Sequence, residues 1–110
     1  MKPVRFVGGA KRDLSAFPDA PRNRAGHEIF MLQTGREPAD WKPMSSIGQG
    51  ACEIRVRDRS GQYRVIYVAV WAKAIYVLHA FQKKSRKTAP LDLELARRRY
   101  SDARAAEAED

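Results

Sequence analysis

The 110-residue sequence predicts one α+β domain over residues 1–110, with helices packed on one face of a mostly antiparallel β-sheet. Three observations support this fold. Helix-like segments stand near both ends of the chain, strand-like segments follow one another between them, and turn residues separate the segments. The composition, 44% apolar and 31% charged residues, is that of a globular protein.

The N-terminal part predicts a short strand followed by two helices. The strand is expected over residues 4–7, a short helical piece over residues 13–17, and a longer helix that begins at about Asp19 and continues through Gln33. Pro21 suits the first turn of the longer helix, and Gly35 suits the position just past its end. Residues 37–50 hold two prolines and two glycines and predict a loop.

The middle of the chain predicts three consecutive strands. Residues 52–58 alternate apolar and polar side chains, residues 63–71 are apolar on both faces apart from Arg64, and residues 74–84 form the third strand. Residues 59–62 have the length of a hairpin turn. Pro90 begins a C-terminal helix, and we expect its acidic end, about residues 103–110, to fray.

Positive charge is concentrated in these predicted strands. The chain has 21 Lys and Arg against 13 Asp and Glu, a formal net charge of +8, and most of the excess lies in residues 53–88. Such a cluster attracts polyanions, so the pattern favours a nucleic acid as ligand. The alternative is a solvated surface that keeps the protein soluble. An anionic membrane is disfavoured because the charge lies on strands rather than on an amphipathic helix.

Other kinds of site lack the required spacing. Cys52 and two distant histidines do not match a metal-ligand pattern, and Gly48-Gln49-Gly50 does not match a nucleotide-binding loop. No apolar run approaches the ~20 residues of a membrane-spanning helix. A single cysteine gives no reason to expect an oxidising compartment. We therefore expect no metal, no cofactor and no membrane partner, and a cytoplasmic location.

Charged residues on the first two of these three predicted strands are candidates for binding an anion. Arg55 and Arg57 are two residues apart, so their side chains point the same way. Arg64 is the only charge in its strand and requires an anionic partner. That partner is either a phosphate of the ligand or, in a purely structural role, Glu53 or Asp58 across the hairpin.

The third strand carries a second candidate cluster. His79, Phe81 and Lys83 share one face of it. An imidazole exchanges protons near neutral pH, and an aromatic ring offers a stacking platform to a base. A structural histidine and a core phenylalanine are the alternatives. Lys84 and Lys87 add positive charge just beyond the cluster.

Five segments carry a family resemblance. They are Trp41-Lys42-Pro43-Met44, Glu53-Ile54-Arg55-Val56-Arg57, Tyr63-Arg64-Val65-Ile66-Tyr67, Val77-Leu78-His79-Ala80-Phe81-Gln82-Lys83-Lys84 and Lys87-Thr88-Ala89-Pro90. Over about residues 3–101 the chain resembles the HigB-like, phage-derived branch of the RelE/ParE toxin superfamily. The segments from His79 onward are the most specific to that branch, and the order of predicted elements agrees with the superfamily's compact fold.

The resemblance implies a type II toxin that cleaves messenger RNA without a metal, commonly on the ribosome, and that a helix-turn-helix (HigA-like) antitoxin neutralises. In such enzymes the substrate's 2′-hydroxyl attacks the adjacent phosphate. Carried over by motif, the catalytic residues are Arg64, which binds the scissile phosphate, together with His79 and Lys83. The RNA-binding residues are Arg55, Arg57, Phe81, Lys84 and Lys87.

Two other functions are compatible with the resemblance, because the superfamily also contains gyrase inhibitors and inactive members. The chain is then a non-enzymatic toxin that acts on DNA gyrase, or an inactive phage-derived protein that only binds RNA. Intact messages together with DNA damage after expression indicate the first. Salt-dependent RNA binding without an effect on growth indicates the second.

Overall fold

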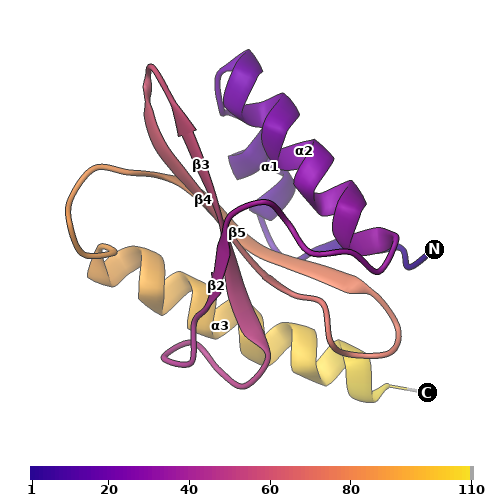
Figure 1. Cartoon of the computed structure of the whole chain (residues 1–110). Coiled ribbons are helices and arrows are strands. Elements are labelled where there is room, and N and C mark those ends of the chain that lie inside the picture. The colour runs from indigo at the N-terminus through magenta and orange to yellow at the C-terminus, as the bar shows by residue number, and fades with distance from the viewer. Residues whose placement is uncertain (110) are drawn as a thin grey trace.

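The computed structural model describes residues 1–109, and its centre is a five-stranded sheet with the strand order β1-β5-β4-β3-β2 (Figure 1). The strands are β1 (Val4–Phe6), β2 (Trp41–Pro43), β3 (Ala51–Asp58), β4 (Gly61–Val68) and β5 (Ile75–Lys83). The helices are α1 (Ala10–Ser15), α2 (Asp19–Gln33) and α3 (Pro90–Ala108). Neighbouring strands are antiparallel except β1 and β5, which are parallel. The predicted α+β class and mostly antiparallel sheet are confirmed.

Helices cover both faces of the sheet, whereas we expected all of them on one face. Helices α1 and α2 lie on one side and α3 on the other (Figure 1). The core on the α1–α2 side includes Ile54 and Val65, and the core on the α3 side includes Ile66 and Leu78. The reason lies in β4, where residues 63–68 are all buried, so that both of its faces need an apolar cover.

Two segments differ from the predicted elements. Residues 41–43, placed in a loop, form the edge strand β2, which pairs with β3. Helix α3 continues to Ala108, past Ala103, where we expected fraying to begin. Ala103 is buried in the core on the α3 side, which anchors this part of the helix. The last residue of the predicted frayed segment, Asp110, lies outside the described residues. No helix within residues 1–109 is long and apolar enough to cross a membrane.

A bulge in β5 determines which way the end of this strand faces. The register of β4 against β5 shifts by one residue, which leaves Leu78 as an extra residue in β5. Before the bulge, Val77 belongs to the core on the α1–α2 side. Strict alternation would place His79, Phe81 and Lys83 on that side as well. The bulge turns these three side chains towards the α3 side instead, where Phe81 joins that core.

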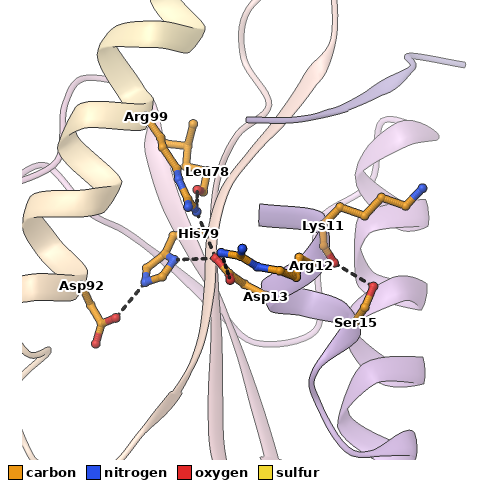
Figure 2. Close-up of polar contacts among 8 residues, drawn as sticks. All are labelled: Lys11, Arg12, Asp13, Ser15, Leu78, His79, Asp92 and Arg99. Carbon is orange, nitrogen blue, oxygen red and sulfur yellow. Dashed lines mark hydrogen bonds and ion pairs between the residues drawn. The ribbon is translucent and has the colours of Figure 1, made fainter. Parts of the chain in front are cut away.

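An arginine from α3 occupies the open edge of β5 beyond the end of β1. Arg99 is 8% exposed, and its Nη1 donates to the carbonyl oxygen of Leu78 at 3.0 Å and to Oδ2 of Asp13 on α1 at 3.1 Å (Figure 2). The arginine lies against the loop before α1, where a Cβ on Gly8 would be 2.9 Å from its Nε. Glycine therefore leaves the space through which Arg99 reaches the sheet edge.

Replacing Gly8 by alanine should destabilise the fold. Gly8 has φ +57°, which is strained for alanine, and Arg99 is held on two sides and cannot move aside freely. We expect the free energy of unfolding, measured by urea denaturation, to fall by about 2 kcal/mol.

Gly26→Ala is the matched control. Gly26 lies inside α2 with no atom within 4 Å of an added Cβ, so alanine should raise the free energy of unfolding by about 0.5–1 kcal/mol. A Gly8→Ala variant as stable as the wild type would contradict the close approach of Arg99.

Candidate nucleic-acid interface

A basic groove lies at the hairpin end of strands β3, β4 and β5. Its volume is about 520 Å³, and it is lined by Arg55, Arg57, Gly61, Gln62, Arg64, Lys83, Lys84, Ser85 and Arg86. Six of these residues are arginine or lysine, and none is acidic. An elongated polyanion with phosphates at short intervals matches such a surface.

Strand pairing brings the arginines of the first predicted cluster and Lys83 of the second into this one groove. Two rows of paired residues cross β3, β4 and β5. They are Arg55–Arg64–Phe81 and, one step nearer the turn, Arg57–Gln62–Lys83. Both rows lie on the same face of the sheet, because the bulge in β5 has turned the last residues of that strand towards the α3 side. The cations predicted from two separate strand patterns therefore form one surface.

Arg64 lies at the back of the basic groove and is paired with Glu53. The residue is 4% exposed, and its Nε is 3.5 Å from Oε1 of Glu53. Its Nη1 donates to the carbonyl oxygen of Tyr63 at 3.1 Å, and its Nη2 donates to Oε1 of Gln62 at 3.0 Å. Burial lowers the pKa of Arg64 and the Glu53 carboxylate opposes that effect. The structural ion pair considered for Arg64 is present, with Glu53.

Asp58, the other acid considered, takes part in the hairpin turn instead. Its Oδ2 accepts hydrogen bonds from the backbone nitrogen of Ser60 at 3.0 Å and from the Ser60 hydroxyl at 2.6 Å. These hydrogen bonds lower the pKa of Asp58. The side chain thus fixes the turn that positions the end of the groove.

Glu53 is buried beneath the cations and offsets part of their repulsion. It is 2% exposed, and its Oε1 also lies 3.6 Å from Nε of Arg55 and 3.8 Å from Nζ of Lys42. Its Oε2 has no hydrogen-bond partner among the described residues. Glu53 faces three cations, including Arg64, and Oδ1 of Asp40 lies 3.9 Å from Nη1 of Arg55, so two carboxylates meet three cations and positive charge remains in excess at the groove.

His79 is buried next to the basic groove but does not line it. Its Nε2 is 2.7 Å from Oδ1 of Asp92 on α3, and its Nδ1 is 3.6 Å from Oδ2 of Asp13 on α1 (Figure 2). The ring stacks on Phe81 with centroids 5.0 Å apart. A general base needs a free nitrogen within reach of the substrate's hydroxyl. Nε2 is occupied by Asp92, and Nδ1, which has no hydrogen-bond partner among the described residues, is buried, so the geometry favours a structural role. Catalysis by His79 stays a prediction.

The remaining predicted residues divide between the groove and its surroundings. Lys83 and Lys84 line the groove, whereas Lys87 lines a smaller cleft beside it. Phe81 is 9% exposed, with one ring face against His79. Within residues 1–109, no group of three or more His, Cys, Asp and Glu side chains is placed to hold a metal ion.

Sequence patterns alone did not identify several residues around the site. They are Gln62 and Arg86 of the groove and Asp13, Asp92 and Arg99 of the network around His79. The sequence does contain information that could have identified the first two. Gln62 pairs with Lys83 when the strands are aligned in register, and Arg86 lies between Lys84 and Lys87 in the loop after β5. The other three come from helices at opposite ends of the chain, and no spacing links them.

Comparison with known families identifies the type of protein. The family described as phage-derived protein Gp49-like (DUF891) matches residues 12–101, which is most of the chain. The protein belongs to the Gp49-like family. This family is of the RelE/ParE-like toxin type, which agrees with the resemblance seen in the sequence. The matched region of the Gp49-like chain contains the whole basic groove. No curated protein matches the sequence.

Breaking the Arg64–Glu53 pair should destabilise this Gp49-like protein. Arg64→Ala leaves the buried carboxylate of Glu53 with the more distant Arg55 and Lys42 as its remaining cations. We expect the free energy of unfolding to fall by about 3 kcal/mol in urea denaturation, because a buried charge loses its partner.

Arg57→Ala is the control for this measurement. Arg57 lines the same groove but is exposed, and no ion pair joins it to another described residue. Its removal should change the free energy of unfolding by less than about 0.5 kcal/mol. Similar losses for the Arg64 and Arg57 variants would contradict the buried pair.

Proposed function

We propose that this protein is the HigB-like toxin of a type II toxin–antitoxin system and acts as a ribosome-dependent, metal-independent endoribonuclease on messenger RNA. Membership of the Gp49-like family supports the toxin class. The observation that carries the choice of RNA as the target is the basic groove, whose lining contains six arginines and lysines and no acidic residue.

In this proposal the substrate's 2′-hydroxyl oxygen attacks the adjacent phosphorus. A 2′,3′-cyclic phosphate forms, the bond to the 5′-oxygen breaks, and the proton lost from the 2′-oxygen is balanced by one gained at the 5′-oxygen. Arg64 and Lys83 stabilise the extra negative charge on the phosphoryl oxygens. Gln62 and Glu53 hold the Arg64 guanidinium in a fixed orientation, so little reorganisation is needed when the charge develops.

The other groove cations bind the phosphates on either side of the scissile one. Arg55, Arg57 and Lys84 take this role, and Lys87 extends it onto the loop before α3. The proposal includes two macromolecular partners, the ribosome, which presents the message, and a helix-turn-helix (HigA-like) antitoxin. The proposal requires that a gene for such an antitoxin lies beside the gene for this protein. It also requires that co-expression of the antitoxin relieves the growth arrest.

Removing one groove cation should abolish most of the activity without unfolding the chain. We expect expression of the wild type to arrest growth and to produce new 5′ ends in cellular messages. Lys83→Ala should lower the rate of cleavage by about 10²- to 10³-fold, since an interaction with the developing charge is lost. Mapping of RNA 5′ ends after induction measures this.

Lys11→Ala is the matched control for Lys83→Ala. Lys11 is an exposed lysine on α1, on the opposite side of the sheet, and should be replaceable without effect. Growth arrest with intact messages and damaged DNA would refute the nuclease and favour a gyrase toxin. Equal cleavage rates for the Lys83→Ala and Lys11→Ala variants would contradict a catalytic role of Lys83 in the groove.

A substitution of His79 separates its structural and catalytic roles. His79→Gln removes the contact to one of the carboxylates that flank the ring, and we expect the free energy of unfolding to fall by about 2 kcal/mol. If the role is structural, the cleavage rate of the folded variant stays within about twofold of the wild type. A loss of about 10²-fold or more in fully folded protein would instead support acid–base catalysis by His79.

A further inference from the structure

A small cleft opens beside the basic groove at the start of α3. Its volume is about 170 Å³, and it is lined by Phe81, Gln82, Lys83, Lys84, Ser85, Lys87, Ala89 and Asp92. Lys83, Lys84 and Ser85 also line the basic groove, so the two hollows adjoin along these three residues. A polymer whose backbone lies in the groove therefore reaches the cleft with a neighbouring group.

Asp92 is the one acidic residue in the lining of this cleft. Its Oδ1 accepts a hydrogen bond from Nε2 of His79 at 2.7 Å, and Figure 2 shows the second carboxylate oxygen turned away from the ring. The Asp92 side chain is 28% exposed, whereas that of His79 is 7% exposed. The buried imidazole thus holds the carboxylate through Oδ1 alone, in a side chain that lines the cleft and is partly exposed.

The chemistry of the cleft suits a neutral group that both donates and accepts hydrogen bonds. A phosphate is repelled by Asp92, and a simple cation is repelled by Lys83 and Lys87. A nucleobase is neutral, and its edge carries both kinds of group. Cytosine presents an amino donor at position 4 beside acceptors at positions 2 and 3, which match the carboxylate and the lysines. Uracil presents a carbonyl oxygen at position 4, which the carboxylate repels, and its one donor on this edge is the N3–H that lies between two carbonyl oxygens.

We propose that this cleft binds the base next to the phosphate in the groove and that Asp92 selects a base with an exocyclic amino group. The inference rests on the proposed function, because it needs RNA in the basic groove. In this role Asp92 determines specificity, and His79 is the positioning residue that holds its carboxylate.

Binding of short RNAs tests the selection without any cleavage. The probes are fluorescent hexamers of cytidine or uridine with 2′-O-methyl groups, which remove the attacking hydroxyl, and the measurement is fluorescence anisotropy. The wild type should bind the cytidine hexamer about tenfold more tightly, as expected for one hydrogen bond to a charged group. A hexamer of N4,N4-dimethylcytidine, which has no amino hydrogen, should lose this advantage.

Asp92→Asn should reduce the preference for cytidine to within about twofold. The asparagine oxygen can still accept from His79, and its amide nitrogen then donates where the carboxylate accepted. Glu94→Gln, at an exposed acid on the same helix that does not line the cleft, is the control and should keep the preference. The dimethylated probe needs only the wild-type protein, so it decides the question even if an Asp92 variant fails to fold.

The outcomes separate this inference from the proposed function. Salt-dependent binding with equal affinity for the cytidine and uridine hexamers overturns the selective cleft and leaves the groove as an RNA site. Equal binding of cytidine and dimethylcytidine hexamers overturns it as well. Failure to bind any hexamer overturns both the cleft and RNA binding by the groove.

Discussion

The fold of this protein depends on how the edge of β5 is closed beyond the end of β1. At the bulge, the carbonyl of Leu78 accepts a hydrogen bond from Arg99, which is itself paired with Asp13. This contact joins a helix from each side of the sheet to the same point of one strand. Without the extra residue, the charged end of β5 would point towards the α1–α2 core, where unpaired cations are costly. Lys83 reaches the basic groove because the bulge turns it the other way.

The groove must also be stable when no polyanion occupies it. Arg55 and Arg64 are directly paired across β3 and β4, an arrangement that is destabilising for like charges. Glu53 lies close to both guanidinium groups from the buried side and offsets this repulsion. Because the carboxylate is shared with Lys42, it does not cancel the charge, and the surface stays attractive to phosphate. The same ion pair that stabilises the fold therefore orients the arginine that we place at the scissile phosphate.

Sequence patterns predicted those features that depend on neighbours along the chain. Alternation identified the strand that ends at Asp58, and a strand apolar on both faces correctly marked β4 as central. A strand that is apolar on both faces also implies that helices cover both faces of the sheet. We expected them on one face because the helix-like and strand-like segments are grouped along the chain. The bulge at Leu78 leaves no trace in a run of residues that are all suited to a strand, so the side on which His79 lies was not predictable. Edge strand β2 was missed because its three residues carry a proline and turn-forming neighbours.

The residues of the site divide in the same way, into those that neighbours along the chain predict and those that depend on long-range contacts. Arg55 and Arg57 were found from local alternation, and Arg64 as the only charge in a strand that is apolar on both faces. The ion pair with Glu53 was foreseen as an alternative because both residues belong to one hairpin. Asp13 and Asp92 were not found, since only the folded chain brings α1 and α3 together at His79. Long-range polar contacts of this kind have no periodicity, and a single sequence contains no signal for them.

Mapping where RNA touches the protein tests the central claim most directly. Addition of a 2′-O-methyl RNA hexamer to ¹⁵N-labelled protein should shift the amide resonances of residues 55–64 and 83–87, at the groove and its adjoining loop. The resonances of α2, on the opposite side of the sheet, should stay unchanged. Shifts that concentrate on α2 while the groove residues remain unaffected would contradict the assignment of the groove as the RNA-binding surface.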